Sequence, residues 1–163
     1  MVFLKLDFTM IEIERKFLVN DLIHQVLKAH QPLAICQGYI YDGADGKTVR
    51  VRTKGNKGYL TIKGKSTGIS RAEFEYEIPY SDAVILLEKF CEKTLIKDRY
   101  NIEVGGMTWD VDQFHGQLEG LIVAEIELED ETQSFEHPEW LAQEVSDDAR
   151  YYNVNLINGS ITL

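Results

Sequence analysis

Regular alternation of apolar and polar residues is the feature of this sequence that most restricts its fold. Successive side chains of a β-strand point to opposite faces, so a period of two predicts strands whose two faces differ. Eight segments have this pattern, at residues 10–19, 34–41, 48–54, 58–65, 70–78, 95–103, 107–114 and 121–130. Glycines between several of these segments supply the turns that hairpins require. The chain is therefore predicted to be rich in antiparallel β-sheet.

Helix signals are confined to two segments and a weakly patterned tail. Residues 21–30 follow an Asn–Asp cap, residues 81–91 begin with a Ser–Asp cap, and both carry apolar side chains at helical spacing. After Phe135 the pattern indicates short helical turns, one started by Pro138 and another capped by Ser146. The expected fold class is thus α+β, with eight antiparallel strands and a few flanking helices.

Charged residues are sorted by sign along the chain. Residues 47–71 contain eight basic side chains and no acidic one, whereas residues 101–148 contain fourteen acidic side chains and no lysine or arginine. The net charge of −10 therefore hides a basic block and an acidic block. Two oppositely charged surface faces would explain these blocks. A single site, in which bases hold an anion and acids hold its metal ion, would also explain them.

Charge on one face of nearly every predicted strand favours a closed barrel. Like-charged pairs, such as Arg50 with Arg52 and Glu125 with Glu127, repel each other unless a counter-charge lies between them. Eight antiparallel strands suffice to close a barrel around such a face. Removing unpaired charges from water is costly, so opposite charges in the interior would pair across the barrel and water would be present. A multiply charged ligand, such as a phosphate chain with its metal ion, would fill the space. An ordinary sheet with one solvated, charged face is the alternative.

The composition excludes several other classes of protein. With 163 residues, of which 44% are hydrophobic and 27% charged, the chain is expected to form one globular domain. No apolar run is long enough for a membrane helix, and the first residues lack the pattern of a signal peptide. Cys36 and Cys91 lie far apart in sequence, which argues against a zinc site or a disulfide and favours the cytoplasm. No nucleic-acid-binding motif is present.

An ordered set of short motifs resembles the CYTH superfamily, the triphosphate tunnel metalloenzymes. Residues 12–16 (EIERK) fit the ExExK signature of the first strand of that family. The motifs that follow are QGY at 37–39, RVR at 50–52, TIK at 61–63, RAEFE at 71–75, KDRY at 97–100, WDVD at 109–112 and AEIE at 124–127. The resemblance starts near Met10, so residues 1–9 are predicted to be an extension, from an upstream start or added artificially. Residues 10–163 are predicted to be one tunnel domain.

This resemblance implies a closed eight-stranded tunnel with a charged interior, which hydrolyses or cyclises triphosphate compounds with Mg²⁺ or Mn²⁺. It assigns the grip on the phosphate chain to bases and two supporting acids, which are Lys16, Arg50, Arg52, Lys63, Lys97, Arg99, Glu73 and Glu75. It assigns metal binding to Glu12, Glu14, Asp112, Glu125 and Glu127. Glu125 or Glu127 is the expected proton acceptor for an attacking water, and Lys97 is expected near the leaving oxygen.

Inorganic triphosphate is the expected substrate, because the chain most resembles short bacterial members of the family that hydrolyse it. An adenylate cyclase, a nucleoside triphosphatase and a thiamine triphosphatase of the same fold share the phosphate grip and remain alternatives. A non-catalytic module that binds polyphosphate or a nucleotide is another, as is a β-rich interaction protein with a solvated charged face. Beyond the substrate, a homodimer is the one partner considered, with neither nucleic acid nor membrane expected.

Three positions call for separate interpretation. Asp110 stands where the family more often has a glutamate, and Cys36 stands where relatives often have a basic residue. Tyr39 is interpreted as a packing or rim aromatic rather than as part of a platform on which a nucleobase stacks.

Overall fold

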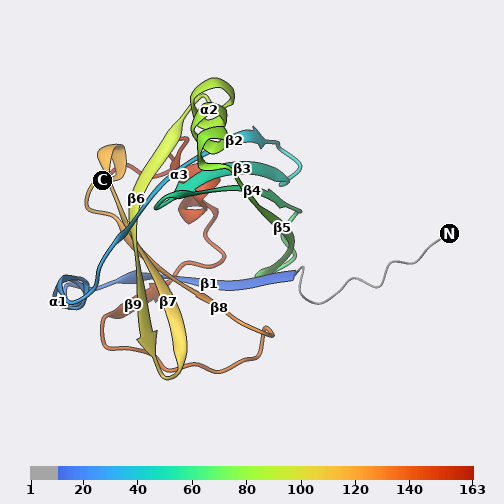
Figure 1. Cartoon of the computed structure of the whole chain (residues 1–163). Helices are drawn as coiled ribbons and strands as arrows, with labels where there is room; N and C mark the ends of the chain where they lie inside the picture. The colour runs from blue at the N-terminus through green and yellow to red at the C-terminus, as the bar shows by residue number, and fades with distance from the viewer. Residues whose placement is uncertain (1–10) are drawn as a thin grey trace.

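Nine strands form one antiparallel sheet that closes on itself in the computed structural model, which describes residues 11–163 (Figure 1). The strands are β1 (Ile11–Val19), β2 (Leu33–Asp42), β3 (Thr48–Lys54), β4 (Lys57–Lys63), β5 (Ser70–Ile78), β6 (Thr94–Val104), β7 (Met107–Phe114), β8 (Ile122–Glu127) and β9 (Leu141–Glu144). Their order in the sheet is β5-β4-β3-β2-β6-β7-β8-β1-β9, and a further pairing of β5 with β1 closes the barrel. The eight predicted strands and the closed barrel are confirmed. The predicted extension, residues 1–9, lies outside the described residues.

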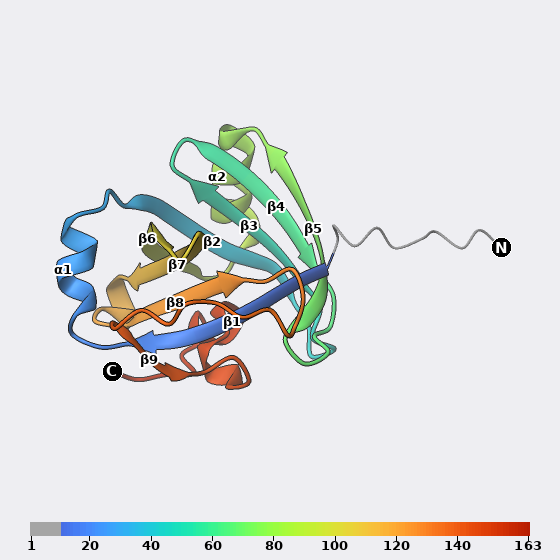
Figure 2. The same cartoon turned by 90° about the horizontal axis from the view of Figure 1, so that it is seen from below.

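Strand β1 is the point of closure. One of its edges pairs with β8 from Glu14 to Leu18. Its other edge pairs with β5 only from Ile11 to Ile13, and farther along it pairs with β9. Seen from below, β9 and the chain that follows it therefore lie beside β1 (Figure 2). This arrangement brings the tail of the chain to the side of the barrel.

The prediction of helical turns for the tail is wrong for the segment that forms β9. Leu141–Glu144 is extended because it pairs with the free edge of β1, a partner that the local pattern does not reveal. Helical turns do follow it, as the 3₁₀ turn η3 (Ala149–Tyr151) and the helix α3 (Asn153–Leu156). The cap of η3 is Asp148, whose side chain accepts a hydrogen bond from the Arg150 backbone amide at 3.1 Å, and not Ser146.

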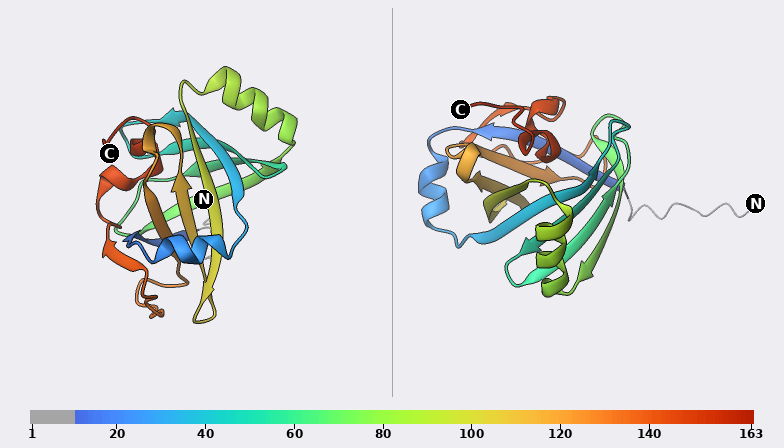
Figure 3. Two further views of the ribbon diagram at one scale, coloured as in Figure 1. Left: turned by 90° about the vertical axis from the view of Figure 1, so that its left-hand side faces the viewer. Right: turned by 90° about the horizontal axis from the view of Figure 1, so that it is seen from above.

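The remaining helices cover the outside of the barrel. Helix α1 (Ile23–Lys28) follows β1, and helix α2 (Tyr80–Phe90) packs on β2, β3 and β4 (Figure 3). A short 3₁₀ turn, η2 (Gly116–Leu118), precedes β8. Both helices were predicted, but α2 begins directly after Pro79 and has no side-chain cap, so the predicted Ser–Asp cap is wrong. Within the described residues, no helix is long and apolar enough to cross a membrane.

The apolar core lies between the outer face of the barrel and the segments that cover it. Beneath α1 and the chain before β9, Trp109 packs edge-on against Phe17 and Trp140, with ring centroids 5.7 and 5.5 Å apart. Two smaller apolar clusters lie beneath α2 and beneath α3. Because side chains alternate along a strand, the residues next to Phe17 and Trp109, which are Lys16 and Asp110, face the interior. Packing of the apolar side chains on the outer face of the barrel thus directs the charged side chains into the interior.

Candidate active site

The barrel encloses a cavity of about 290 Å³ with a lining dominated by charged side chains. Eleven of the thirteen predicted site residues line it, namely Glu12, Glu14, Lys16, Arg50, Arg52, Lys63, Glu73, Glu75, Arg99, Glu125 and Glu127. The two that do not are Lys97 and Asp112, which are fully buried beneath the lining. On the acidic side, Glu14, Asp110, Glu125 and Glu127 also line an outer groove beside the β6–β7 hairpin. Bases and acids from strands far apart in sequence therefore face one space.

Two arginines on β3 form one wall of the cavity. A terminal nitrogen of Arg52 donates to both oxygens of Glu75 at 3.2 Å, and Arg50 donates to Thr61 Oγ1 at 3.2 Å. Thr61 in turn donates to Glu75 at 2.8 Å. Both guanidinium groups are almost completely buried, yet the Nε atoms of both have no hydrogen-bond partner. A buried arginine donor without an acceptor fits an anionic oxygen in the cavity.

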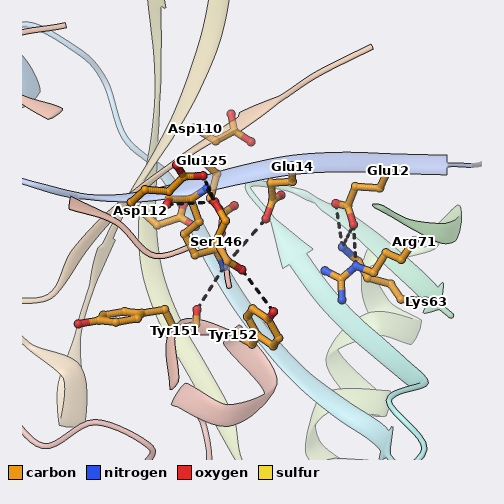
Figure 4. A network of polar contacts seen from close by, with 12 residues as sticks. Glu12, Glu14, Lys63, Arg71, Asp110, Asp112, Glu125, Ser146, Tyr151 and Tyr152 are labelled. Atoms are coloured by element: carbon orange, nitrogen blue, oxygen red, sulfur yellow. Dashed lines mark hydrogen bonds and ion pairs between the residues drawn. The ribbon is translucent and has the colours of Figure 1, made fainter. Parts of the chain in front are cut away.

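A second group of charges lies where β1, β4 and β5 meet. Lys63 Nζ donates to both oxygens of Glu12 at 2.7 and 2.9 Å, and Arg71 Nε donates to the same carboxylate at 2.9 Å (Figure 4). Glu73 lies 2.8 Å from Lys63 on the other side. Burial would raise the pKa of Glu12, but the charges of Lys63 and Arg71 outweigh it and hold that pKa at about 2. Glu12 is therefore an ionised partner of two bases.

Lys16 links the barrel to the tail. Its Nζ lies 2.9 Å from Glu125 and 4.0 Å from Glu14, and it donates to the Tyr151 carbonyl at 3.2 Å. The Lys16 backbone amide donates to Ser146 Oγ at 2.9 Å, and the Tyr152 hydroxyl donates to the Ser146 carbonyl (Figure 4). The tail thus forms part of the cavity wall, to which it contributes Ser146 and Tyr152.

Beneath the cavity floor, Asp112 organises two bases of β6. Arg99 donates to both Asp112 oxygens at 2.6 Å, and Lys97 Nζ lies 2.5 Å from the same carboxylate. The other terminal nitrogen of Arg99 donates to Asp110 at 2.6 Å, and the terminal nitrogen that donates to Asp112 also donates to Glu125 at 3.1 Å. Burial lowers the pKa of Lys97 to about 8, although Asp112 opposes this shift. Lys97 and Asp112 therefore support Arg99, which alone among these three lines the cavity.

Among the residues that the structure describes, Glu14 and Glu127 are the acids of the cavity that no base approaches more closely than 4.0 Å. The two acids are register partners on β1 and β8. The base nearest to Glu14 in the described part of the chain is Lys16, whose Nζ lies 4.0 Å from the carboxylate. Burial and the neighbouring Glu125 raise the pKa of Glu14 to about 7. Burial and the charge of Glu12 likewise raise the pKa of Glu127. Two adjacent carboxylates that lack a counter-charge fit a divalent cation.

The number of free carboxylates restricts which ion fits. No group of three or more acidic, histidine or cysteine side chains in residues 11–163 is arranged to hold a metal ion by itself. Of the predicted metal ligands, Glu12, Asp112 and Glu125 are paired with bases, and only Glu14 and Glu127 remain available. Mg²⁺ commonly uses one or two carboxylates and completes its shell with phosphate oxygens and water. The residues present therefore fit a cation that binds together with a phosphate compound.

Sequence reasoning missed several residues that line the cavity, namely Tyr39, Lys54, Arg71, Asp110, Tyr152 and Asn153. Tyr39, interpreted as a packing or rim aromatic, lines the cavity, where burial raises the pKa of its hydroxyl. Lys54 and Arg71 belong to the basic block, which was the available signal for them. No sequence signal pointed to Tyr152 and Asn153, because their position in the cavity wall depends on where the tail of the chain packs against the barrel.

Comparison with known proteins agrees with this geometry. The family model of the CYTH domain matches residues 10–157. The chain belongs to the CYTH family. An inorganic triphosphatase of Acetivibrio thermocellus is 50% identical over 90% of this chain and 92% of its own length. One of Nitrosomonas europaea is 34% identical over 88% of this CYTH chain and 95% of its own. The crystal structure of an inorganic triphosphatase superposes with a TM-score of 0.61 at 28% identity, over 90% of this chain and 93% of that one.

Proposed function

We propose that this CYTH protein hydrolyses inorganic triphosphate to pyrophosphate and phosphate, with a divalent cation bound in the barrel. The observation that carries the proposal is the cavity itself, which is lined by Arg50 and Arg52, whose Nε atoms have no hydrogen-bond partner, and by two uncompensated acids, Glu14 and Glu127. Both curated relatives described above are named inorganic triphosphatases, which supports the same substrate.

The phosphate chain is held by the bases of the cavity. Lys16, Arg50, Arg52, Lys63 and Arg99 come from four strands and together surround the space. In the structure each of them is paired with an acid, so the ligand exchanges one set of ion pairs for another rather than entering a bare positive site. Planar guanidinium groups match phosphate oxygens through two parallel hydrogen bonds, and this match favours Arg50 and Arg52 as the main contacts.

Glu14 and Glu127 would hold Mg²⁺ or Mn²⁺. When bound, the cation supplies positive charge to the phosphate chain and lowers the pKa of a water ligand. Both oxygens of Glu125 are paired with bases, whereas Glu127 has no base in contact among the described residues, so an oxygen of Glu127 would be the better acceptor for the proton of the attacking water. Two bases, Lys16 and Arg99, hold Glu125 ionised, at a pKa well below its usual range. Glu125 therefore serves to orient those bases.

Arg99 takes the place near the leaving oxygen that the resemblance assigned to Lys97. Lys97 is fully buried and outside the cavity lining, whereas Arg99 lines the cavity directly above it. The negative charge that develops on the leaving pyrophosphate would be met by the Arg99 guanidinium. Lys97 and Asp112 act on the reaction as positioning residues, because Asp112 fixes two of the guanidinium nitrogens.

The cavity favours a small, wholly anionic substrate. Its lining contains few apolar side chains, chiefly Ile69 and Val154, and its aromatic rings are Tyr39 and Tyr152. A nucleobase or a thiazolium group needs apolar or stacking surface to replace its hydration. Inorganic triphosphate needs only charge and hydrogen bonds, which this lining supplies.

Phosphate release from inorganic triphosphate, ATP and thiamine triphosphate, each with Mg²⁺, Mn²⁺ or EDTA, tests the proposal. We expect turnover that requires metal and is fastest with inorganic triphosphate. Glu127→Ala should abolish it, whereas Glu88→Ala, a change of an exposed acid on α2, should leave it intact.

Other outcomes of this assay would redirect the proposal. Turnover of ATP alone, above all to a cyclic product, would assign the fold a cyclase or nucleotide-hydrolysing activity. Tight binding of triphosphate without turnover of any substrate would leave a binding module and refute the hydrolase. Equal turnover in EDTA would refute the role of Glu14 and Glu127 as cation ligands.

We place the protein in the cytoplasm, with which the two free cysteines agree. The substrate is its expected small-molecule partner, and neither a nucleic acid nor a membrane is expected to bind. The homodimer stays a prediction that a mass measurement in solution would test.

A further inference from the structure

Two cysteines outside the cavity, Cys36 and Cys91, share one small apolar cluster between α2 and the barrel. Both pack against the buried group formed by Val51, Ala83 and Leu87. Cys36 lies on β2, and Cys91 is the residue at which α2 ends. Both are partly exposed, and both are free thiols. The distance between them in sequence argued against a disulfide, but the fold brings them to the same place.

Gly38 shows how close the two thiols lie. A Cβ atom placed on Gly38 would be 2.8 Å from Cys91 Cβ and 2.9 Å from Cys91 Sγ, so Cys91 rests directly on the backbone of β2. Gly38 and Cys36 are two residues apart on this strand, so they share a face and lie about 7 Å apart. The Cys91 sulfur is therefore at most about 10 Å from the Cβ atom of Cys36.

The Cys36 thiol also has a neighbour on the Cys91 side. Thr94 is the register partner of Gly38 on β6, and it follows Cys91 closely in the chain. Burial raises the pKa of the Cys36 thiol, and a hydrogen bond with Thr94 opposes that shift, which places the thiol beside Thr94. The charge of Cys36 in turn contributes to the raised pKa of Cys91, whose main cause is burial. Each sulfur thus lies in the surroundings of the other.

We propose that Cys36 and Cys91 form an oxidation site, at which a reversible disulfide joins β2 to the end of α2. The oxidant is a hydroperoxide. One thiolate attacks the peroxide oxygen and becomes a sulfenic acid as water or an alcohol leaves. The second thiol then attacks that sulfur, water leaves, and the S–S bond forms. The pair loses two electrons and two protons, and the O–O bond takes them up.

The position of the bond determines its effect on the protein. Cys91 is in extended conformation just beyond the helix, in the short connection to β6, so it can shift toward Cys36 without disturbing the barrel. Both thiols have a raised pKa, so the thiolate is scarce at neutral pH and oxidation should accelerate as the pH rises. In a reducing compartment the bond would form only on exposure to peroxide.

The test is to treat the full folded chain with hydrogen peroxide at pH 8 and to map its thiols by mass spectrometry after alkylation. We expect the loss of two hydrogen atoms and a linked pair of peptides that contains Cys36 and Cys91. Dithiothreitol should restore both thiols. A disulfide that closes so long a loop should raise the melting temperature by about 5 °C or more. Cys36→Ser and Cys91→Ser are matched variants, which should show neither the linked peptides nor the rise.

Three results would overturn the proposal. The first is oxidation of the folded chain to sulfinic or sulfonic acids without linked peptides. The second is linkage only between two molecules, seen as a covalent dimer. The third is linkage that appears in urea but not in the folded protein, because the fold would then hold the thiols apart. Each is read from mass, so none depends on the triphosphatase activity.

Discussion

Replacing Asp112 with alanine would break the group of charges that holds Arg99 in place. Asp112 is fully buried and accepts hydrogen bonds from Lys97 at 2.5 Å and from Arg99 at 2.6 Å through both oxygens. Its removal leaves the Lys97 ammonium buried with no acid in contact. Loss of one partner of a buried ion pair costs about 3–5 kcal/mol of unfolding free energy. At about 2–4 °C per kcal/mol, the melting temperature should fall by roughly 6–20 °C.

Lys97→Met is the informative counterpart, because it removes the other partner. Asp112 then keeps both of its bonds to Arg99, and the buried ammonium is gone. Burial already lowers the pKa of Lys97 to about 8, so the cost of losing this charge is smaller. We expect a loss of about 1–3 kcal/mol, the range for hydrogen bonds to charged groups. The structure therefore predicts that Asp112→Ala loses more unfolding free energy than Lys97→Met does.

Guanidinium unfolding followed by tryptophan fluorescence measures both variants, because Trp109 and Trp140 are buried in the outer core. Glu88→Ala removes an exposed partner of Lys89 and serves as the control, with no change of the midpoint expected. Kinetics should show a raised KM for triphosphate in Asp112→Ala, since Arg99 loses its support, and a smaller change in Lys97→Met, where Asp112 keeps both bonds to Arg99. A loss below about 1 kcal/mol for Asp112→Ala, or a larger loss for Lys97→Met than for Asp112→Ala, would refute the reasoning.

Three further predictions concern the cavity. Glu14 has a pKa of about 7 in the folded chain, against 4.5 for an unperturbed glutamate, so the folded state loses stability as the pH rises through that window. Glu14→Gln should therefore raise the free energy of unfolding at pH 8 by on the order of 2–3 kcal/mol. At pH 4.5 it should change this free energy little, and coinciding pH profiles of the two proteins would contradict this. Arg52→Lys removes the planar group that donates to both oxygens of Glu75. The fold should persist, and kcat/KM for triphosphate should fall about tenfold or more. An unchanged kcat/KM would show that Arg52 does not touch the substrate. Mg²⁺ with pyrophosphate, the expected product, should stabilise the chain by about 2.7 kcal/mol at a hundred times its Kd. Arg15→Ala, which breaks an ion pair on the outer face, should keep that shift, and the same shift in Glu14→Gln would argue against a cation at Glu14.

The amino-acid sequence by itself determined the strands and the face that each turns inward. Alternation reports which side of a strand a residue occupies, and this is a local property of the extended backbone. Arg50 and Arg52 were therefore placed in the interior before any partner was known. The ordered motifs then identified the family, and eleven predicted site residues reached one cavity.

Alternation does not show how deeply a side chain is buried. It also does not show which residue of a distant strand lies opposite that side chain in the barrel. Lys97 and Arg99 share one face of β6, yet Lys97 is fully buried and bonded to Asp112, whereas Arg99 lines the cavity. The same limit hid the strand β9, which exists only because β1 offers it a free edge. It also hid the proximity of Cys36 to Cys91. These features arise from contacts between segments far apart in the chain, and so only the tertiary structure decided them.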